Sequence, residues 1–126
     1  MNAKEEFISK IGTKDIKYAV VAYDPHGEHD FVDNKGVVNS KAVAAGLEYF
    51  KYDLKHPISV LKEGYTEADL NTFLNTLNYD YDEDYGRQEL FGIVFMKDGS
   101  WWTRAEYDGS EWWTKNTVPD IPECCK

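Results

Sequence analysis

The sequence of 126 residues predicts one α+β domain spanning residues 1–126: an antiparallel sheet of about five strands, ending in a three-stranded meander, with two or three helices packed on it. Three observations lead to this fold class. Two Asp-Gly pairs separate strand-like runs in the segment 88–119, and such pairs are the strongest short-range signal of a hairpin. The run 16–23 is apolar on both faces, and apolar residues recur at helical spacing over 66–77.

The N-terminal segment predicts a helix and then a strand. Asn2 can cap a short helix over residues 2–11, and Gly12 is placed to end it. The following run 16–23, IKYAVVAY, has apolar side chains on both faces, so we expect this strand in the middle of the sheet.

The polar loop 24–30 contains His26 and His29 close to several carboxylates. A metal site is one interpretation, but the spacing fixes no third ligand and differs from the helical H-E-x-x-H motif. A solvated loop is the simpler interpretation. A general acid–base role for either histidine stays open, because histidine is the usual residue for that role. We expect neither a metal nor another cofactor.

The middle of the chain predicts a helix and then a strand. Ser40 can cap a helix over residues 41–50, which Gly46 weakens. The run 52–61 predicts a strand, and Pro57 confines it to an edge of the sheet or to a bulge because proline cannot donate to a ladder.

The clearest helix covers residues 66–77. Thr66 can cap it, and Asp69 is placed three residues later as the partner in a capping box. We expect its apolar stripe to cover one face of the meander. The stripe consists of Leu70, Phe73, Leu74 and Leu77.

The segment 78–89, NYDYDEDYGRQE, concentrates carboxylates and tyrosines. A calcium loop is one interpretation, but counted from Asp80 the turn glycine comes one residue late, and Phe91 stands where a bidentate Glu is needed. A paired-carboxylate hydrolase is another, but no carboxylate is marked as desolvated. A solvated loop and a partner-binding surface are the other two. The candidate binding carboxylates are Asp80, Asp82, Glu83, Asp84 and Glu89.

The meander is predicted to run through strands 89–97, 100–107 and 110–115. If both Asp-Gly turns contain two residues, Phe95 faces Trp102 and Arg104 faces Trp113. Side chains alternate across a strand, so one face is predicted to be core. This predicted core face consists of Leu90, Gly92, Val94, Met96, Trp101, Thr103, Ala105, Tyr107, Trp112 and Thr114.

The opposite face of the meander carries Trp102, Arg104 and Trp113 among charged neighbours. A cation–π pair between Arg104 and Trp113 is one interpretation, with a purely structural role. The other is a partner-binding surface, because Trp and Arg are enriched among residues that dominate binding energy. We include these three residues in the candidate partner-binding site.

The net charge of −9 is distributed unevenly along the chain. Residues 1–63 carry a net charge of −1 and residues 64–126 a net charge of −8. Such a field disfavours direct contact with nucleic acid or an anionic membrane and favours a basic protein partner. No apolar run is long enough for a transmembrane helix, and the charged N-terminus is unlike a secretory signal.

The C-terminal segment combines a proline-rich stretch with a pair of cysteines. Cys124 and Cys125 are adjacent, a spacing that favours neither a structural disulfide nor a metal site, so we expect a reducing, cytoplasmic location. Prolines keep the stretch 119–123 extended, and we expect it to cross the surface of the domain.

The C-terminal half carries a set of short motifs that resembles a known group of proteins. The motifs include GYTE at 64–67, QELFG at 88–92, DGSW at 98–101 and EYDGSEWW at 106–113, followed by P-x-I-P at 119–122. This combination resembles a group of small, acidic, functionally uncharacterised proteins, found mainly in bacteriophages and in the bacteria that carry them. The resemblance covers roughly residues 64–122, and it transfers no functional residue.

These observations favour a non-enzymatic phage-type binding protein. It would dock its acidic and aromatic surface on a host protein of defence or of nucleic-acid handling, in the host cytoplasm, and inhibit it. The alternative is a binder of a small, nucleotide-like ligand, which the Arg104 and tryptophan face would hold at an interface of a homo-oligomer. An enzyme that uses His26 or His29 with the acidic segment is a third hypothesis.

Overall fold

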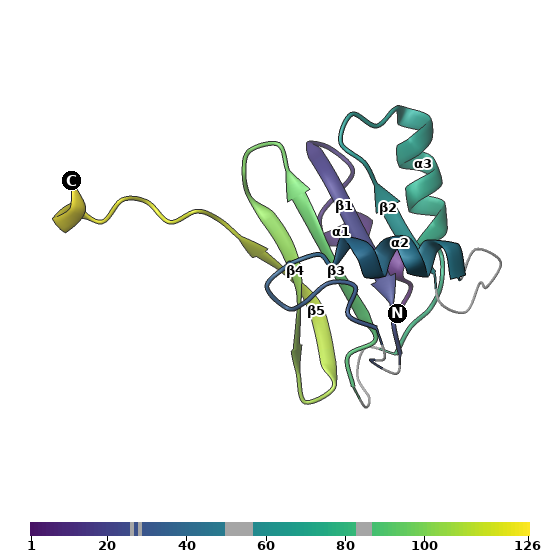
Figure 1. Ribbon diagram of the computed structural model, residues 1–126. Coiled ribbons are helices and arrows are strands. Elements are labelled where there is room, and N and C mark those ends of the chain that lie inside the picture. Colours follow the sequence, from purple (N-terminus) through teal and green to yellow (C-terminus); the bar gives the residue numbers. More distant parts are fainter. Residues whose placement is uncertain (26, 28, 50–56, 83–86) are drawn as a thin grey trace.

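Five antiparallel strands form one sheet in the order β2-β1-β3-β4-β5 (Figure 1). The computed structural model describes residues 1–25, 27, 29–49, 57–82 and 87–126. The strands are β1 (Ile16–Tyr23), β2 (Ile58–Leu61), β3 (Leu90–Met96), β4 (Trp101–Tyr107) and β5 (Ser110–Asn116). The helices are α1 (Ala3–Lys10), α2 (Ser40–Tyr49) and α3 (Glu67–Thr76), followed by a 3-10 turn, η1 (Glu123–Cys125). The predicted α+β fold class is confirmed.

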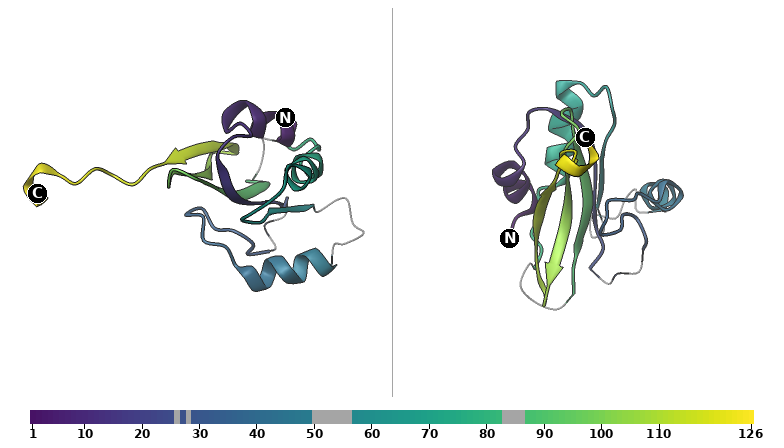
Figure 2. Two further views of the ribbon diagram at one scale, coloured as in Figure 1. Left: turned by 90° about the horizontal axis from the view of Figure 1, so that it is seen from above. Right: turned by 90° about the vertical axis from the view of Figure 1, so that its left-hand side faces the viewer.

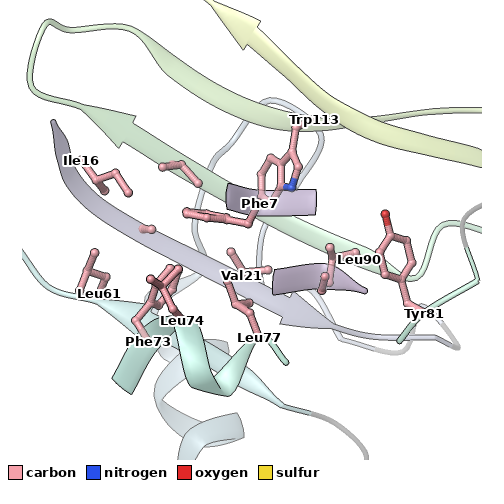
Figure 3. Close-up of a cluster of buried hydrophobic side chains, with 13 residues drawn as sticks. Phe7, Ile16, Val21, Leu61, Phe73, Leu74, Leu77, Tyr81, Leu90 and Trp113 are labelled. Atoms are coloured by element: carbon pink, nitrogen blue, oxygen red, sulfur yellow. The ribbon is translucent and has the colours of Figure 1, made fainter. Parts of the chain in front are cut away.

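Helices cover both faces of the sheet (Figure 2). α1 and α3 pack on one face, over the larger core cluster (Figure 3). There Phe7 meets Phe73 and Trp113 edge to face, with ring centroids 5.5 and 6.1 Å apart. α2 and the loop before it cover part of the other face, where Phe31, Val32 and Val43 are buried. β1 pairs on both sides and buries side chains on both faces, as its sequence predicts.

Local sequence signals account for most helix ends. Asn2 caps α1 by accepting the N–H of Glu5 at 3.0 Å. Thr66 and Asp69 form the predicted capping box of α3, with both hydrogen bonds present. The predicted cap of α2 was wrong, because the side chain of Asn39, not Ser40, accepts the N–H of Ala42 at 3.1 Å. An Asn carboxamide is as good a cap as a Ser hydroxyl, and it lies one residue earlier.

The second strand is the shorter C-terminal part of the predicted run 52–61. β2 begins after Pro57 and forms an edge of the sheet, in agreement with the edge position expected from that proline. Residues 52–56 lie outside the described part of the chain.

The two hairpins of the meander differ in their turns. The β4–β5 turn contains two residues, Asp108 and Gly109, both with positive φ, and its register is as predicted. The β3–β4 loop has one residue more than predicted. The N–H of Met96 donates to the carbonyl of Ser100, which encloses three residues ending in Gly99 at φ +88°. A three-residue loop of this kind ends on a residue in the left-handed region.

This extra loop residue exchanges the two faces of β4 and β5 relative to β3. Phe95 pairs with Trp101, and Val94 pairs with Trp102. A register change of one residue turns every side chain of a strand to the opposite face. The predicted core face was therefore wrong for β4 and β5: Trp102, Arg104 and Trp113 share the α1/α3 side with Val94, while Trp112 is 40% exposed.

The C-terminal segment 117–126 does not cross the surface, contrary to the expectation from its prolines. It leaves the end of β5 and projects away from the domain (Figure 1 and the left view of Figure 2). All of its residues are exposed, including Val118 at 72% and Ile121 at 65%. None of the helices in the described part of the chain is long and apolar enough to cross a membrane.

Candidate functional site

A buried ionic network centred on Arg104 lies between α1 and the sheet. The Arg104 side chain, on β4, reaches Glu6 of α1 with Nη1 at 3.1 Å and Glu111 of β5 with Nη2 at 2.6 Å. Nη2 also donates to the hydroxyl of Tyr81 at 2.9 Å, and that hydroxyl donates to Glu6 at 2.6 Å. All four residues are less than 10% exposed. Two carboxyl groups thus surround one guanidinium in the interior of the domain.

The same network holds both ends of the acidic segment. At the C-terminal end of this segment, residues 78–89, the Glu111 carboxylate accepts the N–H groups of Glu89 at 2.7 Å and of the following Leu90 at 3.1 Å. Near its N-terminal end, Tyr81 is fixed through its hydroxyl to Glu6 and Arg104. Across its base, the N–H of Asp82 donates to the Glu89 carboxylate at 3.0 Å. The network therefore fixes Tyr81 and Glu89 on the two sides of residues 83–86, which lie outside the described part of the chain.

Burial governs the ionisation of the groups in this network. Burial raises the pKa of Tyr81, against the opposing charge of Arg104, and raises the pKa of Tyr79 for the same reason. Burial also raises the pKa of the Glu111 carboxyl, although the N–H of Glu89 and the Arg104 guanidinium both oppose this shift. Every one of these groups is held by packing or by ion pairing, which indicates a structural role.

The structure divides the predicted binding residues into buried and accessible ones. Arg104 and Trp113 are 2% and 4% exposed, so their assignment to a surface was wrong. They lie under α1, where the Arg104 guanidinium carbon sits 5.0 Å from the Trp113 ring centre. Trp102 is half-buried at the opposite end of the sheet. Arg104 and Trp113 are thus part of the core, whereas Trp102 remains partly accessible.

The accessible carboxylates lie at one end of the sheet, where β3 begins and β4 turns into β5; we call this the acidic end. Asp80 and Asp82 are exposed and Glu89 is half-buried. Glu83 and Asp84 lie outside the described residues. The β4–β5 hairpin adds two exposed carboxylates that the sequence reasoning left out of the site, Glu106 and Asp108.

Two exposed aromatic residues accompany these carboxylates. Tyr107 is 77% exposed and Trp112 is 40% exposed, and the register of β4 and β5 places both side chains on the same face of the hairpin. The sequence reasoning assigned both to the core. The length of the β3–β4 loop is the signal that could have identified Tyr107 and Trp112 as exposed. A three-residue loop, in place of a two-residue turn, puts the face of β4 and β5 that carries them on the outside.

A separate hollow lies beside the loop that precedes α2. His29 stacks on Phe31 with ring centres 5.0 Å apart, and its backbone N–H donates to the buried Asp24 carboxylate. A cavity of about 630 Å³ opens here, lined by polar groups such as Asp30 and Asp33 and by Phe91. In the part of the chain that the structure describes, no three His, Cys, Asp or Glu side chains gather as a metal site would require. His26 lies outside that part.

Comparisons with protein-family models, with curated proteins and with solved structures find no match for this chain.

Proposed function

We propose that this protein is a non-enzymatic binding protein whose acidic end docks on a basic surface of another protein and blocks it. One observation supports this above all: four exposed carboxylates and two exposed aromatic rings share one end of the five-stranded sheet. The carboxylates are Asp80, Asp82, Glu106 and Asp108, and the rings are Tyr107 and Trp112.

The composition of this end matches what a basic partner requires. Carboxylates give long-range attraction and fix orientation, while Tyr and Trp supply contact area at a low cost in conformational entropy. The arms of the acidic segment are fixed by the Arg104 network, so part of the ordering cost is met before binding. This arrangement suits a scaffold that presents charges.

The class of partner follows from the charge. Spaced carboxylates can occupy the lysine and arginine groove in which another protein holds nucleic-acid phosphates. A phage-type inhibitor of a host defence or nucleic-acid-handling protein, acting in the host cytoplasm, is the role that we propose from this charge pattern together with the resemblance of residues 64–122 to small, acidic phage-type proteins. Its binding should weaken as salt is added, because the attraction is between exposed charges.

The test compares charge reversals at the two ends of the molecule. In the first variant Asp80, Asp82 and Asp108 are changed to Lys; in the control Glu48, Glu63 and Glu67, which are exposed elsewhere, are changed to Lys. Both variants have the same net charge. Each is used in an affinity capture from nuclease-treated bacterial lysate, and added DNA is tested as a competitor.

We expect the parent and the control to retain one stoichiometric protein that the first variant loses and that DNA displaces. A third variant, Tyr107→Ala with Trp112→Ala, should lose the same protein while keeping its net charge. Capture that is equal for the parent and for the first variant would exclude the acidic end as the binding surface.

The second candidate function is binding of a small ligand. Arg104 and Trp113, two of the residues expected to hold such a ligand, are buried. The cavity beside His29, however, has a volume of about 630 Å³, within the range of ligand pockets. Native mass spectrometry of the purified protein tests this candidate. A retained molecule that is lost from a His29→Ala variant would support it over the docking proposal.

A further inference from the structure

A second surface lies at the end of the sheet opposite the acidic end, where β3 ends and β5 leaves the domain. A groove of about 570 Å³ is present there. It is lined by the apolar side chains of Ile11, Met96 and Trp102 and by the lysines Lys14, Lys97 and Lys115. Two carboxylates, Asp15 and Asp98, also line the groove. Asp98 accepts both the N–H and the hydroxyl of Ser100, so its charge is largely engaged within its own turn.

The groove combines an aromatic wall with an excess of lysine. The chain as a whole carries a net charge of −9, whereas the groove lining has three cationic and two anionic side chains. Such a surface attracts an anionic segment that also has an apolar side chain to place against Trp102.

The C-terminal segment 117–126 has these properties. It carries Asp120 and Glu123 next to the exposed apolar residues Val118 and Ile121. Within the described chain, its hydrogen bonds and its ion pair stay inside the segment. In Figure 1 and in the left view of Figure 2 it points away from the domain as an extended arm.

The segment is poorly placed to fill the groove of its own chain. Lys115 lines the groove, and the strand β5 ends at the next residue. Folding back would require a sharp reversal immediately before Pro119, where proline fixes its own φ and restricts the preceding Val118 to extended conformations. An extended segment of this length reaches roughly 30 Å, which is enough to contact another molecule of similar size.

We propose that the segment 117–126 of one copy occupies the groove of a second copy, so that two copies exchange their C-terminal arms in a two-fold dimer. Ile121 would pack against Trp102 and Met96, and Asp120 and Glu123 would approach the lysines. A two-fold arrangement lets both arms and both grooves engage at once and closes the assembly at two copies. Once one arm is bound, the second arm binds within the same dimer, so the two contacts together give a higher affinity than either contact alone without any additional contact area. The proposal is independent of the acidic end and of its partner.

The test uses reciprocal charge reversal, measured by sedimentation equilibrium with a reductant that keeps Cys124 and Cys125 from cross-linking. In the groove variant Lys97 and Lys115 become Glu, and in the arm variant Asp120 and Glu123 become Lys. Each variant alone should dissociate at a concentration at least about tenfold higher than the parent, because attraction is replaced by repulsion.

Mixing the two variants supplies the sharpest readout. The reversed groove then meets a reversed arm, and the unchanged groove meets an unchanged arm, so a heterodimer of nearly parental affinity is expected. Lys35→Glu with Lys41→Glu, two exposed lysines outside the groove, serves as the charge-matched control and should dimerise like the parent. The double variant Val118→Ser with Ile121→Ser should also weaken the dimer. Both substituted residues lie in the C-terminal segment, outside the folded domain.

Several outcomes would overturn the proposal. One is a parent that stays monomeric up to about 1 mM, the limit of weak association. Another is a dimer that survives deletion of residues 117–126, which would place the interface elsewhere. A third is a mixture of the two variants that stays monomeric. Finally, a small anion retained by the monomeric parent in native mass spectra, and lost from the groove variant, would assign the groove to a ligand.

Discussion

Arg104 is the residue whose loss the folded chain should tolerate least. Replacement by Met keeps the aliphatic stem but leaves Glu6 and Glu111 buried without a cation. Breaking a buried ion pair by removing one partner costs about 3–5 kcal/mol. We therefore expect Arg104→Met to lower the free energy of unfolding in urea by this amount.

The control for this substitution is Lys62→Met, which removes an exposed lysine after β2. Its effect should stay within about 0.5 kcal/mol, as for most surface changes. An Arg104→Met protein as stable as the Lys62→Met protein would show that the buried carboxylates become neutral at little cost, contrary to the role assigned to Arg104.

Tyr79 and Tyr81 should respond differently to loss of their hydroxyl groups. The Tyr79 hydroxyl is buried and has no hydrogen-bond partner within the described chain, whereas the Tyr81 hydroxyl bonds to Glu6 and Arg104. We expect Tyr79→Phe to be nearly neutral at pH 7. Tyr81→Phe should cost about 1–3 kcal/mol, because it leaves charged partners unsatisfied. Urea unfolding at neutral pH distinguishes the two.

The buried hydroxyl of Tyr79 is also expected to make the folded protein less stable at alkaline pH. Burial raises the pKa of Tyr79 above its ordinary value of 10.0. The unfolded chain therefore loses this proton from about pH 10 upward, while the folded chain keeps it. The free energy of unfolding is at its full value below pH 10 and falls above it. For this group the fall is up to about 1.4 kcal/mol per pH unit. In Tyr79→Phe the slope above pH 10 should be shallower by this amount. An unchanged slope would mean that the hydroxyl ionises without unfolding.

At the level of secondary structure, the sequence predicted the elements better than their registration. Capping at Asn2 and Thr66, the apolar run of β1 and the two-residue turn at Asp108-Gly109 are local signals, and the structure confirms each of them. The β3–β4 loop failed because Asp-Gly is compatible both with a two-residue turn and with a three-residue loop that ends on Gly99. One residue in that choice decided which tryptophans are buried.

The Arg104 network could not be predicted for a related reason. Glu6 comes from α1, Tyr81 from the segment that precedes β3, Arg104 from β4 and Glu111 from β5. Only the tertiary fold brings these residues together. In the sequence Arg104 and Glu111 are charged residues on an apparently solvated strand face. Polar residues that the core accepts because they satisfy one another carry no periodic signal. Part of the acidic end, by contrast, was visible as a cluster of carboxylates over 80–89, although Glu106 and Asp108 of the β4–β5 hairpin were left out.

Gly92 in β3 provides a direct test of the observed register. A Cβ atom at this position would lie 2.8 Å from the carbonyl oxygen of Val20 and 2.9 Å from the Trp113 ring. Because one of these contacts is backbone, we expect Gly92→Ala to cost about 1–3 kcal/mol through overpacking. In the register expected from the sequence, Trp113 would point to the other face and this contact with its ring would be absent.

The measurement is the urea unfolding midpoint of Gly92→Ala, alone and combined with Trp113→Phe. The smaller ring should recover part of the loss, and the remainder reflects the contact with Val20. Exactly additive effects of the two substitutions would indicate that Gly92 and Trp113 do not touch.

Across the whole molecule, the two proposed binding surfaces are far enough apart to act independently. β4 has seven residues and joins the two ends of the sheet. At about 3.3 Å per residue it spans roughly 23 Å, against a screening length of about 8 Å at physiological salt. Charge reversals at Lys97 and Lys115 should therefore leave partner capture by the acidic end unchanged, and reversals at Asp80 and Asp82 should leave self-association unchanged.

The exposed C-terminal arm gives the last prediction. Because residues 117–126 are exposed along their length, deleting them should change the unfolding free energy of the dilute, monomeric protein by no more than about 0.5 kcal/mol. At high concentration the full chain should gain stability, since self-association favours the folded state by mass action. Its melting temperature, followed by calorimetry in reductant, should rise with protein concentration, while that of the deletion variant should stay constant. A deletion variant that melts earlier even at high dilution would instead show that the arm stabilises its own domain.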